Sequence, residues 1–226
     1  MKYIKLFGTH SEYEAYIQDR QNLVLPNVSF CEDTPNEVHY NPYEEPDTRL
    51  IATFSGGGSK QLYGYEHFDF NVDGATLFNS IEIDGTDVSI QELDNNEGKY
   101  TFSSGEHVVK YVLKDPTKIT SGMFILSDPH TVMIPNTVEE IEGDVFMNAR
   151  NLSSVTIPSS VTSIGYGILE GRSNLSLIVE AVTPPSLAES LGYTSNLIIY
   201  VPSESVDTYK AAENWSNYAS IIQAIQ

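Results

Sequence analysis

Basic residues are scarce in this sequence. The 226 residues contain 12 Lys and Arg against 31 Asp and Glu, which gives a formal net charge of −19. A field of this sign repels phosphate backbones and anionic membrane surfaces, so it argues against nucleic acid as a direct partner. The single cysteine, Cys31, excludes an internal disulfide. No apolar run approaches the roughly 20 residues of a membrane-spanning helix, so we expect no membrane insertion.

A secretory signal is also missing from the first residues. The opening apolar run ends at Gly8 and turns polar, without the apolar stretch and small-residue cleavage site of a signal peptide. We therefore expect a chain that is not exported through such a signal. With 40% hydrophobic residues, the chain is long enough to bury a core, and its length allows one large domain or two smaller ones.

The second half of the sequence repeats itself. The apolar and proline positions Val132, Ile134, Pro135, Val138, Ile141 and Phe146 recur, all at the same offset, as Val155, Ile157, Pro158, Val161, Ile164 and Leu169. A partial unit precedes them at Ile119 and Phe124, and degenerate units follow, so the repeats run from about residue 119 to 202. Such a constant period is the signature of a stacked repeat architecture.

The residue types of one unit indicate its local structure. Alternation of Val and Ile with Ser and Thr over 154–157 predicts a short strand with one buried face, and Pro158 ends it because proline cannot donate to a ladder. Val161 and Ile164 then turn back toward the same core. One unit cannot bury its own apolar side, so neighbouring units stack and share a core.

This pattern resembles the BspA-like leucine-rich repeat. The resemblance covers about residues 115–226 and implies a short leucine-rich-repeat solenoid, of a kind found in bacterial surface proteins and in phages of gut bacteria. The tail is similar to the closing segment of that family. Ser203 or Ser205 is expected to cap a short helix carrying Val206 and Tyr209, and the segment that follows, including Trp215, completes a C-terminal helical cap.

Residues 47–114 read differently. Short alternating runs are separated by turn-forming clusters such as GGGS, DGT and SSGE, which predicts a small antiparallel β-sandwich. Its last strand, at 107–113, runs directly into the first repeat, so we expect the edge of the sandwich to cap the stack. The predicted fold is therefore mainly β, with this sandwich between an N-terminal α+β module and the repeats.

Residues 1–46 form the predicted N-terminal attachment module. Thr9 and Glu12 match a capping box for a short helix that carries Tyr13, Tyr16 and Ile17 on one face. Two short strands are predicted around a turn at 33–36. The whole pattern resembles a leader shared by structural proteins of crAss-like gut bacteriophages, and this resemblance implies an attachment role for Tyr13, Tyr16 and Ile17.

Catalytic and metal-binding patterns are not apparent. The GGGSK stretch lacks the spacing of a phosphate-binding loop, and Cys31 and His39 have no identifiable third group to orient them. The five histidines never occur at metal-ligand spacing, and the acidic DNNEG stretch at 94–98 lacks that of a calcium loop. We expect no enzyme activity, no cofactor and no metal.

Recognition is the function that these features favour. Exposed residues of a repeat stack can vary without disturbing the core, and tyrosine suits binding because its ring is apolar while its hydroxyl forms hydrogen bonds. The candidate ligand-binding residues on the strands are Thr131, Met133, Ser154 and Thr156, and those on the loops are Tyr166 and Tyr193. The alternative is that these residues bind no ligand and are simply the solvent-exposed side of a sheet.

We therefore expect a virion-associated fibre or decoration protein of a tailed bacteriophage. Its N-terminal module would bind other virion proteins, and its repeats would bind a glycan or protein of the host surface. One alternative is a bacterial cell-surface adhesin of the BspA-like type, and another is a purely structural assembly subunit. The sequence leaves open whether the chain forms a homo-oligomer.

Overall fold

The computed structural model describes residues 6–7, 28–31, 39–40, 48–64 and 73–225. The chain divides into two compact units, Met1–Asp47 and Thr48–Gln226. In the first unit, β1 (Leu6–Phe7) pairs in parallel with β2 (Val28–Cys31), and β2 pairs antiparallel with β3 (His39–Tyr40). This pairing confirms the two predicted short strands. The predicted helix with Tyr13, Tyr16 and Ile17 lies outside the described residues.

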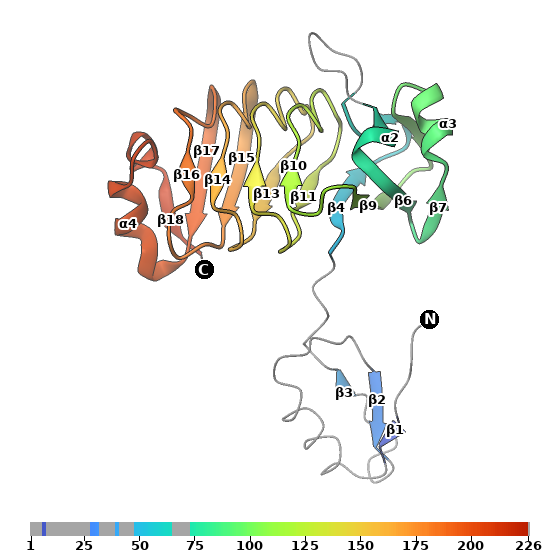
Figure 1. Cartoon of the computed structure of the whole chain (residues 1–226), viewed down its shortest axis with the longest axis horizontal. Helices are drawn as coiled ribbons and strands as arrows, with labels where there is room; N and C mark the ends of the chain where they lie inside the picture. The colour runs from blue at the N-terminus through green and yellow to red at the C-terminus, as the bar shows by residue number, and fades with distance from the viewer. Residues whose placement is uncertain (1–5, 8–27, 32–38, 41–47, 65–72, 226) are drawn as a thin grey trace. The chain divides into compact units, whose positions relative to one another are not determined.

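One nine-stranded mixed sheet organises the second unit (Figure 1). Its strands, in spatial order, are β18 (Ile222–Ala224), β17 (Thr194–Val201), β15 (Arg172–Val179), β13 (Ser154–Ile157), β11 (Thr131–Met133), β4 (Leu50–Ser55), β9 (Glu106–Leu113), β6 (Phe78–Ile83) and β7 (Thr86–Val88). The strands from β18 to β11 are parallel, and the direction reverses where β11 meets β4.

A second parallel sheet faces the repeat strands across the core. It contains β10 (Lys118–Ile119), β12 (Glu140–Ile141), β14 (Ser163–Ile164) and β16 (Ser186–Leu187). Corresponding residues pair in register, so that Ile141 aligns with Ile119 on one side and with Ile164 on the other. Each repeat therefore contributes one strand to each sheet, and this is why the sequence repeats at a nearly constant interval.

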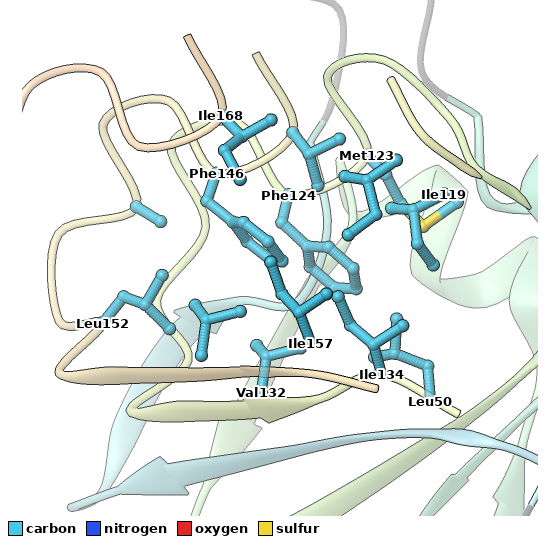
Figure 2. Close-up of a cluster of buried hydrophobic side chains, with 14 of the residues drawn as sticks. Leu50, Ile119, Met123, Phe124, Val132, Ile134, Phe146, Leu152, Ile157 and Ile168 are labelled. Carbon is cyan, nitrogen blue, oxygen red and sulfur yellow. The ribbon is translucent and has the colours of Figure 1, made fainter. Parts of the chain in front are cut away.

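The core lies between these two sheets (Figure 2). The five apolar positions of each repeat named above are at most 5% exposed, which confirms them as the core of the stack. Phe124 and Phe146, one repeat apart, stack with ring centroids 5.7 Å apart. Burial of each aliphatic or aromatic side chain contributes about 1.5–3 kcal/mol, and each repeat needs its neighbour to achieve it.

Asparagine and aspartate side chains join successive repeats at the edge where the strands begin. Asn151 donates to Asp128 (3.3 Å), and Asn196 donates to Asn174 (2.9 Å). Both Asn174 and Asn196 have φ of 54°, a left-handed conformation that asparagine tolerates better than most residues. Asp128 also accepts a hydrogen bond from the backbone of Gln61, which connects the first repeat to the preceding strands.

The predicted sandwich differs from the structure in its layers. Four of its strands continue the sheet of the repeats, and only the two-stranded sheet of β5 (Gly58–Gln61) and β8 (Lys99–Phe102) forms a second layer, through the stacking of Phe102 on Phe54. Two short helices, α2 (Gly74–Leu77) and α3 (Ile90–Asn95), were not predicted. The strand that pairs with the first repeat is β4, not the strand at 107–113.

The reason is the open edge of β11. Without a partner on that side, its backbone N–H and C=O groups would have only water to bind, and β4 supplies a ladder instead. The hydrogen bonding between the two segments continues past the end of β11, where the His130 N–H donates to the Thr53 carbonyl at 2.7 Å. The two hydroxyls of Thr53 and Thr131 also form a hydrogen bond of 2.7 Å.

A C-terminal cap closes the other end of the stack. It consists of the 3₁₀ turn η1 (Ser203–Ser205), α4 (Val206–Ala211), the 3₁₀ turn η2 (Trp215–Tyr218) and β18. Tyr209 and Trp215 are buried as predicted. Neither predicted serine caps the helix through its side chain; the Ser205 hydroxyl is buried without a partner among the described residues.

Side chains of the cap take the place of a further repeat. The Tyr209 hydroxyl donates to the Ala181 carbonyl (2.7 Å), the Trp215 indole to the Pro185 carbonyl (2.8 Å), and the Asn214 amide to the Leu187 carbonyl (2.6 Å). Burial of the Tyr209 hydroxyl raises its pKa, so it stays a donor at every physiological pH. The cap thus supplies hydrogen-bond donors for these three backbone carbonyls at the end of the stack.

Candidate functional site

The solvent-facing side of the repeat strands carries two lateral rows of side chains. Strand register places Met133, Thr156, Ile178, Tyr200 and Gln223 in one row, and Thr131, Ser154, Ser176 and Ile198 in the other. Neighbouring strands lie about 4.8 Å apart, so each row is a regular array. The four strand residues predicted to bind ligand, Thr131, Met133, Ser154 and Thr156, all lie in these rows, which we call the row face.

Five residues of the row face were missed by sequence reasoning: Ser176, Ile178, Ile198, Tyr200 and Gln223. The signal was available, since Met133, Thr156, Ile178 and Tyr200 follow one another at nearly equal intervals along the sequence. After residue 169 the repeats depart from the consensus, because β15 and β17 are each eight residues long. This departure is why Ile178 and Tyr200 were not recognised as equivalents of Met133 and Thr156.

The row face carries no charge, although the chain has a net charge of −19. Met133 is 55% exposed and Gln223 is exposed, while the other seven side chains are half-buried by their neighbours. Hydroxyl groups alternate with aliphatic and aromatic side chains. Such a surface can exchange hydrogen bonds and apolar contacts with an uncharged partner without desolvating a charge.

Charged groups lie on the opposite sheet instead. Lys118 contacts Glu142 at 2.9 Å and Glu140 at 3.4 Å, bridging the first two repeats. The hydrogen bond with Glu142 raises the pKa of Lys118, and the same contact lowers the pKa of Glu142. These partly exposed pairs contribute little to stability, and they leave the two faces of the stack chemically distinct.

The two predicted loop tyrosines lie on turns, away from the strand rows. Tyr166 is 50% exposed and Tyr193 is 80% exposed. The backbone of Tyr193 donates to the Glu170 carboxylate (2.7 Å), and the Tyr166 carbonyl accepts from the backbone of Asp144. Their rings are therefore available for contact with a partner. The attachment residues Tyr13, Tyr16 and Ile17 lie outside the described part of the chain.

Titratable groups gather at two places in the part of the chain that precedes the repeats. His107 is paired through Nδ1 with the Asp84 carboxylate (2.7 Å) and through Nε2 with the Ser103 carbonyl (3.1 Å). Both partners accept hydrogen bonds, so the protonated ring fits best; the Asp84 bond raises the pKa of His107 and lowers that of Asp84.

The second place lies around Gly74. The Asp94 carboxylate accepts from the Tyr63 hydroxyl (2.6 Å) and from the backbone of Gly74 and Ala75, and Asp73 also accepts from Ala75. A hydrogen bond with Asp94 raises the pKa of Asp73. In the part of the chain that the structure describes, no group of three or more metal-ligating side chains is found.

A pocket of about 420 Å³ lies between β7, α3 and β8, lined by residues such as Asp87, Glu92 and Tyr100. Among its lining residues, the Ser89 hydroxyl accepts a hydrogen bond from the Glu92 N–H (3.3 Å) and caps α3. Across residues 48–64 and 73–225, no helix is long and apolar enough to cross a membrane.

Comparison with known protein families finds a match to the repeats. The model of the BspA type leucine rich repeat region matches residues 76–183 in six copies. The match begins before the first repeat strand, and parallel pairing continues beyond it to β17 and β18. It supports a BspA-like leucine-rich repeat protein, and a repeat domain of this type suggests a binding or adhesion role. A comparison with curated proteins found no match.

Proposed function

We propose that this chain is a non-enzymatic binding protein of a tailed bacteriophage particle. In this proposal the repeats form a short solenoid whose row face binds a glycan or protein of the host surface, and residues 1–46 attach the chain to other virion proteins. The protein needs no cofactor. In the alternative proposal, a bacterial surface adhesin, the row face would bind in the same way, but the N-terminal module would attach to the bacterial cell surface instead of to a virion.

The observation that carries the binding role is the uncharged row face on a strongly acidic chain. Acidic side chains keep such a protein soluble and repel polyanions, so a face free of them, two rows deep and four strands wide, is available for neutral contacts. The repeat match supports recognition as the general role. The virion assignment rests on the resemblance of residues 1–46 to phage leader segments.

Charge insertion tests the binding role. Met133 is an exposed side chain of the row face, so Met133→Lys adds one positive charge there without filling the core. Ser186→Lys adds the same charge on the exposed side of the other sheet and is the matched control. The assay is binding of the labelled full chain to washed cells of the source culture.

We expect Met133→Lys to weaken cell binding by at least about tenfold, because an unpaired ammonium buried at an interface costs more than about 1.4 kcal/mol. Ser186→Lys is expected to bind as the unmodified chain does. Equal binding by all three chains would refute the row face as the binding surface. Absence of binding by the unmodified chain, with the chain present in virus particles, would favour the purely structural role.

A further inference from the structure

The two rows of the row face continue onto β4. Ile51 pairs with Met133 and Thr53 with Thr131, and both are half-buried while the β4 residues that alternate with them are buried. Beyond β4 the same row becomes charged, beginning with Lys110 on β9. The row face together with Ile51 and Thr53 is therefore an uncharged surface across six neighbouring strands, from β4 to β18 (Figure 1), which we call the neutral strip.

The neutral strip is long and narrow. With strands about 4.8 Å apart, it is about 24 Å long, and its two rows, two residues apart along each strand, are separated by about 7 Å. Its area is thus on the order of 300 Å², whereas a stable protein–protein interface needs about 800 Å² on each partner. On its own the neutral strip is too small for a stable complex with a second copy of this chain or with another globular protein. Its shape fits a chain-like ligand that lies across the strands.

Hydroxyl groups of the neutral strip are ready to bind such a ligand. Among the described residues, none provides a hydrogen-bond partner for the hydroxyls on three adjacent strands, those of Ser154, Thr156, Ser176 and Tyr200. Each hydroxyl can donate one hydrogen bond and accept two. The aliphatic side chain of Ile178 lies between Thr156 and Tyr200 in the same row. A matching partner offers hydroxyl groups and apolar C–H surface side by side, which is the chemistry of a sugar ring.

Strand spacing distinguishes a glycan from a peptide as the chain-like ligand. An extended peptide turns every second side chain toward a surface, at intervals of about 7 Å, which does not match strands about 4.8 Å apart. Its backbone also pairs with the edge of a sheet and not with its face. An extended glycan of six-membered rings advances by about one strand spacing for each ring. Each strand of the neutral strip can therefore meet one ring.

The charge of the chain selects among glycans. A net charge of −19 repels acidic polymers, so a polysaccharide that carries carboxylates or phosphates is disfavoured. Within its described strands, the neutral strip has no basic side chain to pair with such groups and no acidic side chain to pair with an amino sugar. A neutral glycan is the class of ligand that remains, since it buries no unpaired charge on binding.

We propose that the neutral strip binds a linear, neutral polysaccharide that runs along the stack of repeats, with one sugar ring on each strand. This inference rests on the proposed binding role of the row face and specifies its ligand. Ser154 and Ser176 exchange hydrogen bonds with ring hydroxyls. The apolar faces of the rings lie against Met133, Ile178 and the ring of Tyr200, which combines apolar surface with a hydroxyl.

Competition with extracted polysaccharide tests the proposal. The probes are the neutral and the acidic fraction of polysaccharide from cells of the source culture, separated by anion exchange, and the assay is binding of the labelled full chain to those cells. We expect the neutral fraction to displace the chain and the acidic fraction not to do so. Among size-sorted fragments of the neutral fraction, affinity is expected to rise by at least about tenfold up to about six rings, one for each strand, and then to level off.

Two serine variants locate the contact. Ser176→Ala removes one hydroxyl of the neutral strip without touching the core, and it is expected to weaken binding of the neutral fraction by about two- to tenfold. Ser163→Ala removes a half-buried hydroxyl from β14 in the other sheet and is the matched control, expected to bind as the unmodified chain does. Equal affinity of the two variants for the neutral fraction would overturn the proposal.

Failure of the glycan can be told apart from failure of the row face. If protease treatment of the cells abolishes binding, or if only the acidic fraction competes, while Met133→Lys still weakens cell binding, the neutral glycan is overturned and the row face remains the binding surface. If Met133→Lys binds cells as the unmodified chain does, the row face itself is refuted. Competition by the neutral fraction, with cell binding intact after protease treatment, is the result that we expect.

Discussion

The cap at the C-terminal end gives the sharpest stability prediction. Trp215 is 1% exposed, donates its indole N–H to the Pro185 carbonyl at 2.8 Å, and meets the Tyr209 ring edge-on with centroids 5.1 Å apart. Trp215→Ala removes the ring, the hydrogen bond and the contact with Tyr209. Truncations of this kind cost about 3–5 kcal/mol. Trp215→Phe keeps most of the ring but leaves the Pro185 carbonyl without its donor, at a cost of about 1–3 kcal/mol.

These free energies translate into melting temperatures. For a cooperative unit of this size, each kcal/mol shifts Tm by about 2–4 °C, so Trp215→Ala is expected to lower Tm by about 6–20 °C and Trp215→Phe by a smaller amount. The assay is thermal unfolding followed by circular dichroism, with Tyr193→Ala, an 80% exposed ring, as the control that leaves Tm unchanged. A Trp215→Ala chain that melts like the control would refute the role of the cap.

Three further predictions follow from local geometry. Because the pKa of His107 is raised in the fold, its pairing with Asp84 stabilises the fold fully below the ordinary pKa of 6.5, and this stability is lost as pH rises through the raised pKa. Tm measured against pH should show this loss in the unmodified chain and not in His107→Gln. Asn174→Ala removes the hydrogen bond with Asn196 and places alanine in a left-handed conformation, so it is expected to lower the free energy of unfolding in urea by about 1–3 kcal/mol. Asn174→Gly relieves the backbone strain but does not restore the hydrogen bond. A Cβ at Gly165 would clash with the backbone nitrogen of Gly143, so Gly165→Ala is expected to lower Tm by separating two repeats. Gly85→Ala has open space around it and is expected to cost only the strain of its left-handed φ of 82°.

The repeats could be predicted from sequence because their information is local and periodic. Val155, Ile157 and Ile164 recur at a fixed interval after Val132, Ile134 and Ile141, and a stacked fold is the arrangement that buries all of them. The cap was expected from the resemblance of the tail to the closing segment of such repeats, and large apolar residues such as Trp215 follow the last unit.

The joining of the two halves could not be predicted in this way. Pairing of β4 with β11 brings together residues far apart in the sequence, such as Thr53 and Thr131, and nothing in either short strand specifies the other. Alternating strands predict a buried face, but they do not say whether the sheet they form is separate or continuous. The helices α2 and α3 were missed because they are four and six residues long, too short for a helical period to register.

The candidate binding residues were predicted only where the repeat is regular. Thr131, Met133, Ser154 and Thr156 follow from the consensus unit, whereas Ile178 and Tyr200 depend on the register of β15 and β17. The Asp73 and Asp94 carboxylates both accept the Ala75 N–H through the tertiary fold, so the sequence did not predict this contact.

Quantitative mass spectrometry of purified virus particles and of washed cell envelopes from the source culture tests the central proposal most directly. We expect recovery of this chain in particles, in fixed ratio to the other virion proteins. Recovery in envelopes alone would contradict the phage assignment and identify the chain as a bacterial surface adhesin.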